Sequence, residues 1–197
     1  MKLLLASHNY NKRDEIRALL PAGIELVCLS DIGINEEIAE TGKTLEENAI
    51  IKAESASLAS GMPAFADDTG LEVKALNGLP GVRSARFAGD KATMSDNICK
   101  LLAMMNERED RKARFRTVIA LIDGSTTKLF EGIVEGVLAL EPRGSGGFGY
   151  DPLFIPDGYT HTFAEMSPEM KNSISHRSVA IARLTAHLTE SSMHNKR

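Results

Sequence analysis

Two adjacent acids, Asp67 and Asp68, are the residues of this chain best suited to chemistry. They stand in Ala64-Phe65-Ala66-Asp67-Asp68-Thr69-Gly70, where a short apolar run ends in two carboxylates, a hydroxyl and a glycine. The apolar run predicts a buried strand, and ligands of open α/β sheets gather where such strands end. Two neighbouring carboxylates are costly unless they are solvated, paired or bound to a cation. Taken alone, these residues favour an exposed turn, because Asp, Thr and Gly form turns. The rest of the chain reverses that preference.

A polar loop near the N-terminus is a candidate anion site. Residues 2–6 are continuously apolar and predict a buried strand, and apolar spacing over residues 12–20 predicts a helix. The loop between them points free N–H groups and the positive end of the helix dipole at one place. Ser7, Asn9 and Lys12 add a hydroxyl, an amide and a cation. An Asn-rich turn that only caps the helix would have the same sequence.

A capped helix leads directly into the strand that carries the two acids. Thr44 and Glu47 form a capping box, and the Ala-rich segment that follows runs to Ser60, with Gly61 as its stop. Asn48 and Lys52 are one turn apart and share a face of this helix. Lys52 is either a surface lysine that extends along apolar neighbours, or the cation that faces the acids of the next strand.

The glycine-rich segment of residues 141–151 contains a literal G-x-G-x-x-G match from Gly144 to Gly149. A dinucleotide fingerprint must open a helix, and the following Pro152 prevents one, because the residue before a proline is extended. A glycine-rich loop can instead let the backbone approach a flat ring while Phe148 stacks on that ring. The alternative is a flexible surface loop, which the apolar residues 153–155 disfavour because they anchor it to a buried strand.

The last chemical signal precedes the C-terminal helix. Ser167 and the following proline predict a helix start, and a helix that we expect from Ser173 to about Leu188 places His176 and Arg177 in its first turn. A cation at that end opposes the helix dipole and needs a compensating anion or ligand. This unfavourable placement indicates a functional role.

The remaining patterns predict an α/β protein with a mixed sheet flanked by helices. We expect further strands at residues 24–29 and 71–76, a helix at 93–105 that Thr93 and Asp96 cap, and a hairpin that joins strands 114–123 and 126–140. The charged run at residues 107–112 is a plausible boundary between lobes. The length fits one domain over residues 1–197, with two lobes and no separate linker.

The composition is that of a soluble globular protein, with 197 residues, 43% hydrophobic and 25% charged. A net charge of −4 argues against a broad nucleic-acid-binding surface. Cys28 and Cys99 lack CxxC spacing, so we expect small core residues in a reducing compartment. The apolar start is too short for a signal peptide and no stretch predicts a membrane span. We therefore expect a cytoplasmic protein with a solvated tail at residues 194–197 and no nucleic-acid or membrane partner.

Seven segments, in sequence order over nearly the whole chain, resemble the dITP/XTP pyrophosphatase family, the RdgB-type inosine triphosphate pyrophosphatases. The resemblance implies Mg²⁺-dependent hydrolysis of ITP, dITP and XTP to the monophosphate and pyrophosphate, an elongated two-lobed α/β fold with a central cleft, and a homodimer. The family's first loop commonly reads Thr-Gly-Asn-x-x-Lys, whereas this chain has Ser7-His8-Asn9-Tyr10-Asn11-Lys12. The other segments are Glu40-Thr41-Gly42, Glu47-Asn48-Ala49-Ile50-Ile51-Lys52-Ala53, Ala66-Asp67-Asp68-Thr69-Gly70, Gly78-Leu79-Pro80-Gly81-Val82-Arg83-Ser84-Ala85-Arg86, Gly146-Gly147-Phe148-Gly149-Tyr150-Asp151-Pro152 and Ser175-His176-Arg177.

By analogy with the family, Asp68 is the base and a metal ligand, with Lys52 beside it and Glu40 as the second ligand to Mg²⁺. Adjacent residues of a strand face opposite ways, so Asp67 is expected to have a supporting role. A triphosphate brings about four negative charges, which need cations and a metal. Phe148 is expected to stack on the base. The residues expected to bind substrate are Ser7, His8, Asn9, Tyr10, Asn11, Lys12, Thr69, Phe148, Gly149, Tyr150, Asp151, Lys171, His176 and Arg177.

Two other functions share features with this sequence. A nucleotide-binding sensor without catalysis could use the same pocket and would bind ITP without cleaving it. A Maf-like nucleotide pyrophosphatase shares a strand–loop–helix phosphate site and recognises other bases. The Phe148 loop and residues 175–177 disfavour that second alternative.

Overall fold

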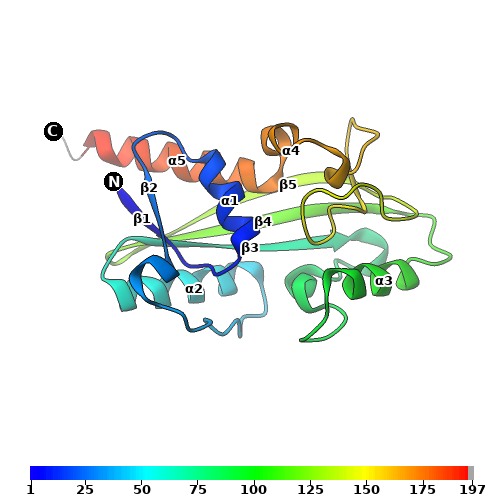
Figure 1. The fold of residues 1–197 in the computed structure, drawn as a ribbon, viewed down its shortest axis with the longest axis horizontal. Coiled ribbons are helices and arrows are strands. Elements are labelled where there is room, and N and C mark those ends of the chain that lie inside the picture. The colour runs from blue at the N-terminus through cyan, green and yellow to red at the C-terminus, as the bar shows by residue number, and fades with distance from the viewer. Residues whose placement is uncertain (195–197) are drawn as a thin grey trace. The chain divides into compact units, whose positions relative to one another are not determined.

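The structure is a computed structural model that describes residues 1–194; most of the tail expected at residues 194–197 lies outside this range. Within these residues, six strands form one sheet in the order β2-β1-β3-β4-β5-β6, and Figure 1 labels β1 to β5. β1 is parallel to both β2 and β3, whereas β5 and β6 are antiparallel, so the predicted mixed sheet is confirmed. The strands are β1 (Lys2–Leu5), β2 (Glu25–Cys28), β3 (Ala64–Val73), β4 (Lys112–Asp123), β5 (Thr126–Leu138) and β6 (Phe154–Pro156).

The described residues also form five α-helices and four short 3₁₀ helices. Side-chain caps that the sequence predicts begin three of them: Thr44 accepts from the backbone N–H of Glu47, Thr93 forms a capping box with Asp96, and Ser167 accepts from the backbone N–H of Met170. The α-helices are α1 (Tyr10–Leu19), α2 (Leu45–Ser60), α3 (Met94–Met104), α4 (Pro168–Ile174) and α5 (His176–His194). The 3₁₀ helices are η1 (Leu29–Ile32), η2 (Lys74–Leu76), η3 (Gly81–Arg86) and η4 (Phe163–Glu165). No helix in the described part of the chain is long and apolar enough to span a membrane.

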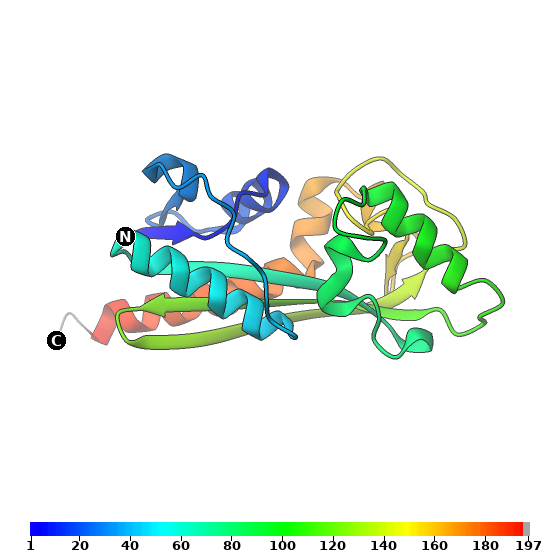
Figure 2. The ribbon, with the colours of Figure 1, turned by 90° about the horizontal axis from the view of Figure 1, so that it is seen from below.

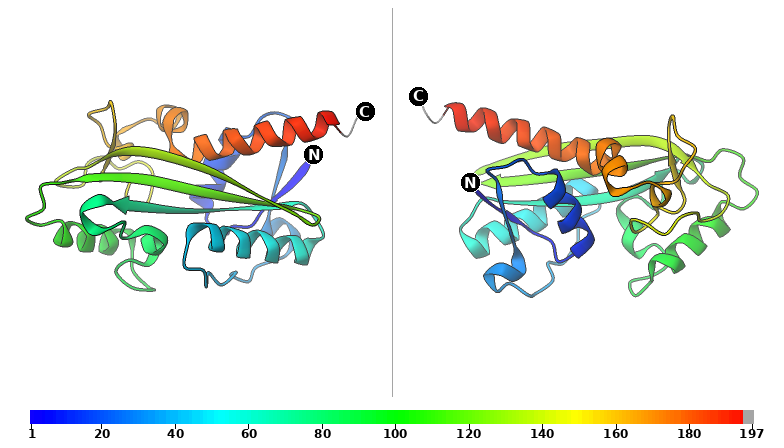
Figure 3. Two further views of the ribbon diagram at one scale, coloured as in Figure 1. Left: turned by 180° about the vertical axis from the view of Figure 1, so that it is seen from behind. Right: turned by 45° about the horizontal axis from the view of Figure 1, so that its top comes forward.

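The chain divides into two compact units, with boundaries inside β3, β4 and β5. Unit 1 comprises Met1–Asp68, Thr117–Gly132 and the C-terminal segment from Arg177; unit 2 comprises Thr69–Arg116 and Ile133–His176. In unit 1, α2 and α5 lie on opposite faces of the strands (Figure 3). The chain reverses after α2 and enters β3 through a short connection (Figure 2). In unit 1, residues 64–68 of β3 are buried, and their side chains alternate between the two faces.

Each unit has its own apolar core. In unit 1, residues of α1 and α5 pack together with Phe65 and Ile119 from the strands, which places both helices on one face. In unit 2, three aromatic rings pack against one another: the centroid of Phe115 lies 4.8 Å from that of Phe154 and 6.0 Å from that of Phe163. Burial of such large apolar side chains is the main source of stability.

The structure corrects the expected strand at residues 71–76. β3 continues without interruption to Val73, and Lys74–Leu76 forms the 3₁₀ helix η2. Gly70 does not turn the chain; a Cβ there would lie 2.5 Å from the carbonyl oxygen of Gly81, so its role is to let two backbones approach closely. The turn comes at Asn77, whose φ of 52° is left-handed. The exposed-turn alternative for Asp67 and Asp68 is therefore wrong.

Two further expectations also differ from the structure. The helix expected from Ser173 is interrupted, because Ser175 is extended with φ −69° and ψ 155°, so α4 ends before it and α5 begins at His176. α5 also continues beyond Leu188. Cys28 is buried as expected, but Cys99 is exposed, because it falls on the outer face of α3.

Candidate active site

Asp68 lies in a buried cluster formed with α2 in unit 1. Its Oδ1 atom is 2.7 Å from Nζ of Lys52, and its Oδ2 atom accepts from Nδ2 of Asn48 at 3.3 Å. Lys52 Nζ also lies 2.7 Å from Oε1 of Glu40 and 3.0 Å from the carbonyl oxygen of Asp67. Asn48 and Lys52 share one helical face, as their spacing predicts. Lys52 is thus the cation that faces the acids, and the alternative of a surface lysine is wrong.

Asp67 points to the other face of β3, toward α1 and α5. Lys12 Nζ lies 3.2 Å from its Oδ1 atom, and the Nε and Nη2 atoms of Arg177 donate to its Oδ2 atom at 3.2 and 3.1 Å. Arg177 also pairs with Glu15. These two carboxylates are the anions that a cation in the first turn of α5 requires. Adjacent acids therefore have different partners, as strand geometry predicts.

Burial and neighbouring charges shift the pKa values of the two acids in opposite directions. Burial would raise the pKa of Asp67, but Lys12 and Arg177 outweigh it and hold the pKa well below its usual range. Burial raises the pKa of Asp68, and Glu40 adds to this, although Lys52 and Lys12 oppose it. The carboxylates of Asp68 and Glu40 overcome the burial of Lys52 and raise its pKa, so the ammonium stays charged. Asp67 is thus a fixed anion, whereas Asp68 is the more basic carboxylate.

The loop of residues 7–12 forms a compact helix start. Asn9 caps α1 by accepting from the backbone N–H of Lys12 at 3.2 Å, and Ser7 Oγ accepts from the N–H of Asn9 at 3.2 Å. α1 begins at Tyr10, earlier than expected. His8 Nε2 lies 3.1 Å from the carbonyl oxygen of Glu36. Within residues 1–194, His8 is not among the non-glycine residues with positive φ, so this loop does not require glycine at that position.

The carboxylates of Asp68 and Glu40 fit a divalent metal that is shared with a substrate. Both converge on one ammonium group, Lys52 Nζ, at 2.7 Å each. Among the described residues there is no group of three or more His, Cys, Asp or Glu side chains that could hold a metal ion. Mg²⁺ is commonly held by only one or two carboxylates together with substrate phosphates and water. Two hard carboxylates are therefore sufficient on the protein side.

A second group of predicted residues lies in unit 2, around the carboxylate of Asp151. Its Oδ2 atom is 2.6 Å from Nζ of Lys171 and accepts from the backbone N–H of Phe148 at 2.8 Å. The same ammonium lies 5.1 Å from the centroid of the half-buried Phe148 ring. Gly147 has a φ of 67°, and a Cβ there would collide with Oδ2 of Asp151. The glycine-rich loop is thus built tightly around one buried carboxylate.

His176, Tyr150 and Gly149 belong to the same unit. The imidazole of His176 is buried and stacked on Phe115, with centroids 4.6 Å apart. Tyr150 is also buried and donates its hydroxyl to the carbonyl oxygen of Ser84 at 3.0 Å. The N–H of Gly149 points at the sulfur of Met94, 2.9 Å away. No helix opens in this loop, which confirms that the G-x-G-x-x-G match is not a dinucleotide fingerprint.

The structure thus gathers the predicted residues into two groups, each described within its own unit. Unit 1 brings together Lys12, Glu40, Lys52, Asp67, Asp68 and Arg177, and unit 2 brings together Phe148, Asp151, Lys171 and His176. Sequence reasoning placed Arg177 beside His176 at a base, whereas its partners in the structure are Asp67 and Glu15. Sequence reasoning missed Glu15, although its position three residues after Lys12 on one helix was a usable signal.

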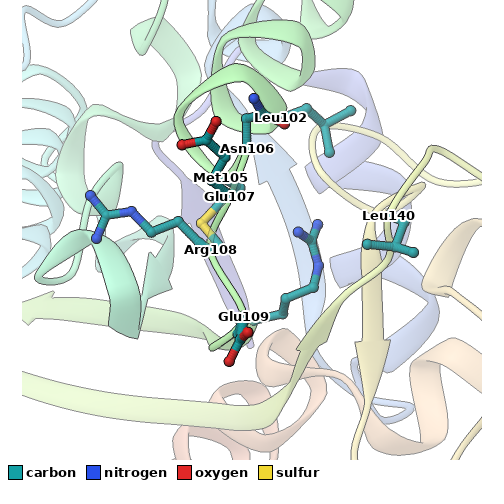
Figure 4. A pocket seen from close by; sticks show the side chains of 8 residues that line it. Leu102, Met105, Asn106, Glu107, Arg108, Glu109 and Leu140 are labelled. Atoms are coloured by element: carbon teal, nitrogen blue, oxygen red, sulfur yellow. The ribbon is translucent and has the colours of Figure 1, made fainter.

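A cavity of about 530 Å³ lies elsewhere in unit 2, where α3 leads into β4 (Figure 4). None of its lining residues belongs to the two groups above. Its two arginines donate to backbone carbonyls, Arg108 to Ala75 and Arg111 to Leu138 and Ala139. These guanidinium groups therefore brace the surrounding loop.

The mixed sheet flanked by helices defines an α/β protein, and its buried carboxylate–lysine cluster is the candidate active site. The model of the Ham1 family matches residues 3–187, and the chain belongs to this family. The dITP/XTP pyrophosphatase of Porphyromonas gingivalis is 54% identical over 184 residues, which cover 93% of this chain and 95% of that protein. The dITP/XTP pyrophosphatase of Christiangramia forsetii is 52% identical and covers 96% of this chain and 100% of its own.

Solved structures of the family have the same fold. The Ham1 protein of Staphylococcus aureus has a TM-score of 0.88 at 40% identity and covers 97% of this chain and all of its own. A HAM1 protein from Coxiella burnetii has a TM-score of 0.88 at 42% identity, and the match covers 96% of this chain and 99% of that protein. These matches confirm the family resemblance and the α/β fold that the sequence predicts.

Proposed function

We propose that this protein hydrolyses deaminated purine nucleoside triphosphates, ITP, dITP and XTP, to the monophosphate and pyrophosphate. The observation that carries the proposal is the buried cluster in which Lys52 Nζ lies 2.7 Å from a carboxylate oxygen of both Asp68 and Glu40. Relatives that cover almost the whole chain are named dITP/XTP pyrophosphatases. Hydrolysis of this kind removes damaged bases from the nucleotide pool.

Asp68 is assigned as the general base. Its burial raises its pKa, which makes it a better proton acceptor than an exposed aspartate, and Asn48 and Lys52 fix the orientation of its two oxygens. The carboxylate orients a water molecule and takes its proton as the water oxygen bonds to the α-phosphorus. The bond from that phosphorus to the bridging oxygen breaks, and pyrophosphate leaves. Lys52 keeps its charge beside the carboxylate throughout.

Glu40 and Asp68 would hold Mg²⁺, which supplies charge neutralisation and phosphoryl polarisation when it is bound. Lys12 contributes a further cation from the first turn of α1. Asp67 keeps Lys12 and Arg177 in place with a permanent negative charge, which is a supporting role. The N-terminal end of α1 completes an anion-binding helix start.

The purine is assigned to the residues of unit 2. Phe148 supplies a half-buried ring face, and Lys171 and the backbone N–H groups of its loop supply donors. A 6-oxo purine presents an acceptor where adenine presents an amino donor, so a pocket lined with donors favours the former. Sites built to form hydrogen bonds discriminate such mismatches by factors of about 10⁴. Asp151 holds both Lys171 and the loop in position.

The decisive experiment incubates the purified protein with Mg²⁺ and ITP, XTP, GTP or ATP and identifies the products. Inosine monophosphate and pyrophosphate are expected from ITP, with ATP turned over far more slowly. Orthophosphate with a diphosphate would show attack at the wrong phosphorus. ITP that binds and remains intact would instead support a sensor, and preference for other bases would support a Maf-like activity.

Two further properties follow from the family resemblance. The protein is proposed to be a homodimer, which sedimentation velocity would test at micromolar concentration. It is proposed to act in the cytoplasm, where the nucleotide pool lies, and fractionation of cells that express a tagged protein would test this.

A further inference from the structure

The glycine-rich loop of unit 2 is attached to β3 through a short hydrogen-bonded chain that the proposed chemistry does not use. The chain passes through η3 (Gly81–Arg86), which forms part of the Gly78–Arg86 motif. Its central residue is Ser84, which is 8% exposed and uses its side chain and its backbone for different partners. No substrate role was assigned to this motif from the sequence.

The side chain of Ser84 joins η3 to β3. Its Oγ atom accepts from the backbone N–H of Leu71 at 2.9 Å and donates to the carbonyl oxygen of Gly81 at 2.6 Å. Leu71 is only three residues beyond Asp68 on the same uninterrupted strand. The adjoining backbones are pressed together, since a Cβ on Gly70 would lie 2.5 Å from the Gly81 oxygen. η3 is therefore fixed to one point of β3.

The backbone of Ser84 joins η3 to the glycine-rich loop. Its carbonyl oxygen accepts from the hydroxyl of Tyr150 at 3.0 Å, a bond between residues 66 positions apart. Tyr150 is 4% exposed and stands between Gly149 and Asp151, with Phe148 two residues before it. A buried hydroxyl that loses its acceptor is costly, so this bond holds the Tyr150 ring in one place.

We propose that Ser84 and Tyr150 form a latch that positions the base-binding loop, so that Ser84 is a positioning residue for nucleotide recognition. The proposal rests on the proposed function, which places the purine against Phe148. The latch fixes Tyr150, and Tyr150 fixes the backbone that carries Phe148 on one side and Asp151 on the other. A loop that is already ordered before binding loses less conformational entropy when it binds a flat base.

The latch makes a prediction that a purely structural role does not. Tyr150→Phe removes the hydroxyl and keeps the ring, and Ser84→Ala removes Oγ and keeps the carbonyl oxygen. Each variant should raise the KM for ITP about three- to ten-fold, the loss that corresponds to one net hydrogen bond, with kcat within about two-fold of the parent. The preference for ITP over ATP in kcat/KM should fall. Because both variants break one chain, the double variant should fall short of the product of the two effects.

Tyr159→Phe is the matched control, because Tyr159 lies in the same unit, is 39% exposed and belongs to none of the groups described above. It should leave KM and kcat unchanged. Amide hydrogen exchange provides a readout that does not depend on activity: the segment of residues 144–150 should exchange faster in Tyr150→Phe and in Ser84→Ala than in the control.

An equal loss of kcat/KM for ITP and for ATP would leave the preference for ITP unchanged. That result would show a structural role only and would overturn the latch. An unchanged KM with unchanged exchange in residues 144–150 would overturn it as well. Failure of the parent protein to cleave ITP would overturn the proposed function instead, and the exchange experiment would still decide whether the latch exists. The two failures are therefore distinguishable.

Discussion

Asp67 and Asp68 are sequence neighbours whose carboxylates have different ion-pair partners: Asp67 pairs with Lys12 and Arg177, whereas Asp68 pairs with Lys52. The two carboxylates lie on opposite faces of β3, one toward α1 and α5 and the other toward α2. Their different surroundings lower the pKa of Asp67 and raise that of Asp68. The predictions below separate a carboxylate that supports the fold from one that acts on substrate.

Asp68→Asn should abolish turnover while sparing the fold. The amide has nearly the same shape but accepts no proton, and loss of a general base costs about 10²–10⁴ in rate. The variant should show the parent circular dichroism spectrum and less than one-hundredth of the parent kcat for ITP. Near-parent rates would remove Asp68 from the mechanism.

Asp67→Asn should act mainly on stability. Arg177 is 1% exposed and would lose its ion pair with Asp67 while it keeps the one with Glu15. Breaking a buried ion pair by removing one partner costs about 3–5 kcal/mol in the free energy of unfolding. Urea denaturation at neutral pH measures this loss. In the double variant Asp67→Asn/Arg177→Met much of the stability should return, and a double variant no more stable than Asp67→Asn would contradict the assignment.

Phe148→Ala should raise the KM for ITP about ten-fold, because stacking on a base contributes about 1–3 kcal/mol. Phe148→Tyr keeps the ring face and should retain most of the affinity. Initial-rate kinetics with ITP for the two variants tests the stacking role. The role is disproved if Phe148→Ala leaves KM as in the parent.

Gly147→Ala should loosen the glycine-rich loop more than Gly158→Ala. Both glycines have positive φ, 67° and 84°, so the backbone strain of an alanine is similar, about 1 kcal/mol. Only at Gly147 does the new Cβ collide with a neighbour, the carboxylate of Asp151, whereas nothing lies within 4 Å at Gly158. Thermal denaturation should show a larger loss for Gly147→Ala. Equal losses would indicate that Asp151 moves aside freely.

Removal of divalent metal with EDTA should stop hydrolysis of ITP, and added Mg²⁺ should restore it. Glu40→Gln should weaken Mg²⁺ binding, because one carboxylate ligand is lost. The Mg²⁺ concentration that gives the half-maximal rate should rise about ten-fold. The measurement is a magnesium titration of the rate at saturating ITP. An unchanged titration would exclude Glu40 as a ligand.

Local patterns were sufficient for much of the fold. Thr44 and Thr93 cap α2 and α3 as predicted, and the two long strands joined by residues 124–125 form the expected hairpin. The spacing of Asn48 and Lys52 correctly placed both on one face of α2, and the structure adds that this face lies toward Asp68. In each case the residues that predict the element lie within a few positions of it in the sequence. Periodicity and capping chemistry are therefore enough to predict these elements.

Partners that are distant in the sequence could not be predicted in the same way. Arg177 bonds to Asp67 across 110 residues. No local sequence pattern predicts which acid compensates a cation in the first turn of a helix. The bond from Tyr150 to Ser84 spans 66 residues and joins a tyrosine to a backbone oxygen, which any residue type could provide. The extended Ser175 divides α4 from α5 although serine is compatible with a helix interior. Tertiary packing decides these features.

The opposite orientation of Asp67 and Asp68 restricts how the gene can vary. A strand has a side-chain repeat of two, so deletion or insertion of a single codon between Ala64 and Ala66 would rotate the acidic pair by half a turn. The carboxylate of Asp68 would then face α1 and α5, and the carboxylate of Asp67 would face Lys52 on α2. A substitution at either acid removes one function, whereas a change of length by one residue would exchange the two carboxylates and destroy both functions at once.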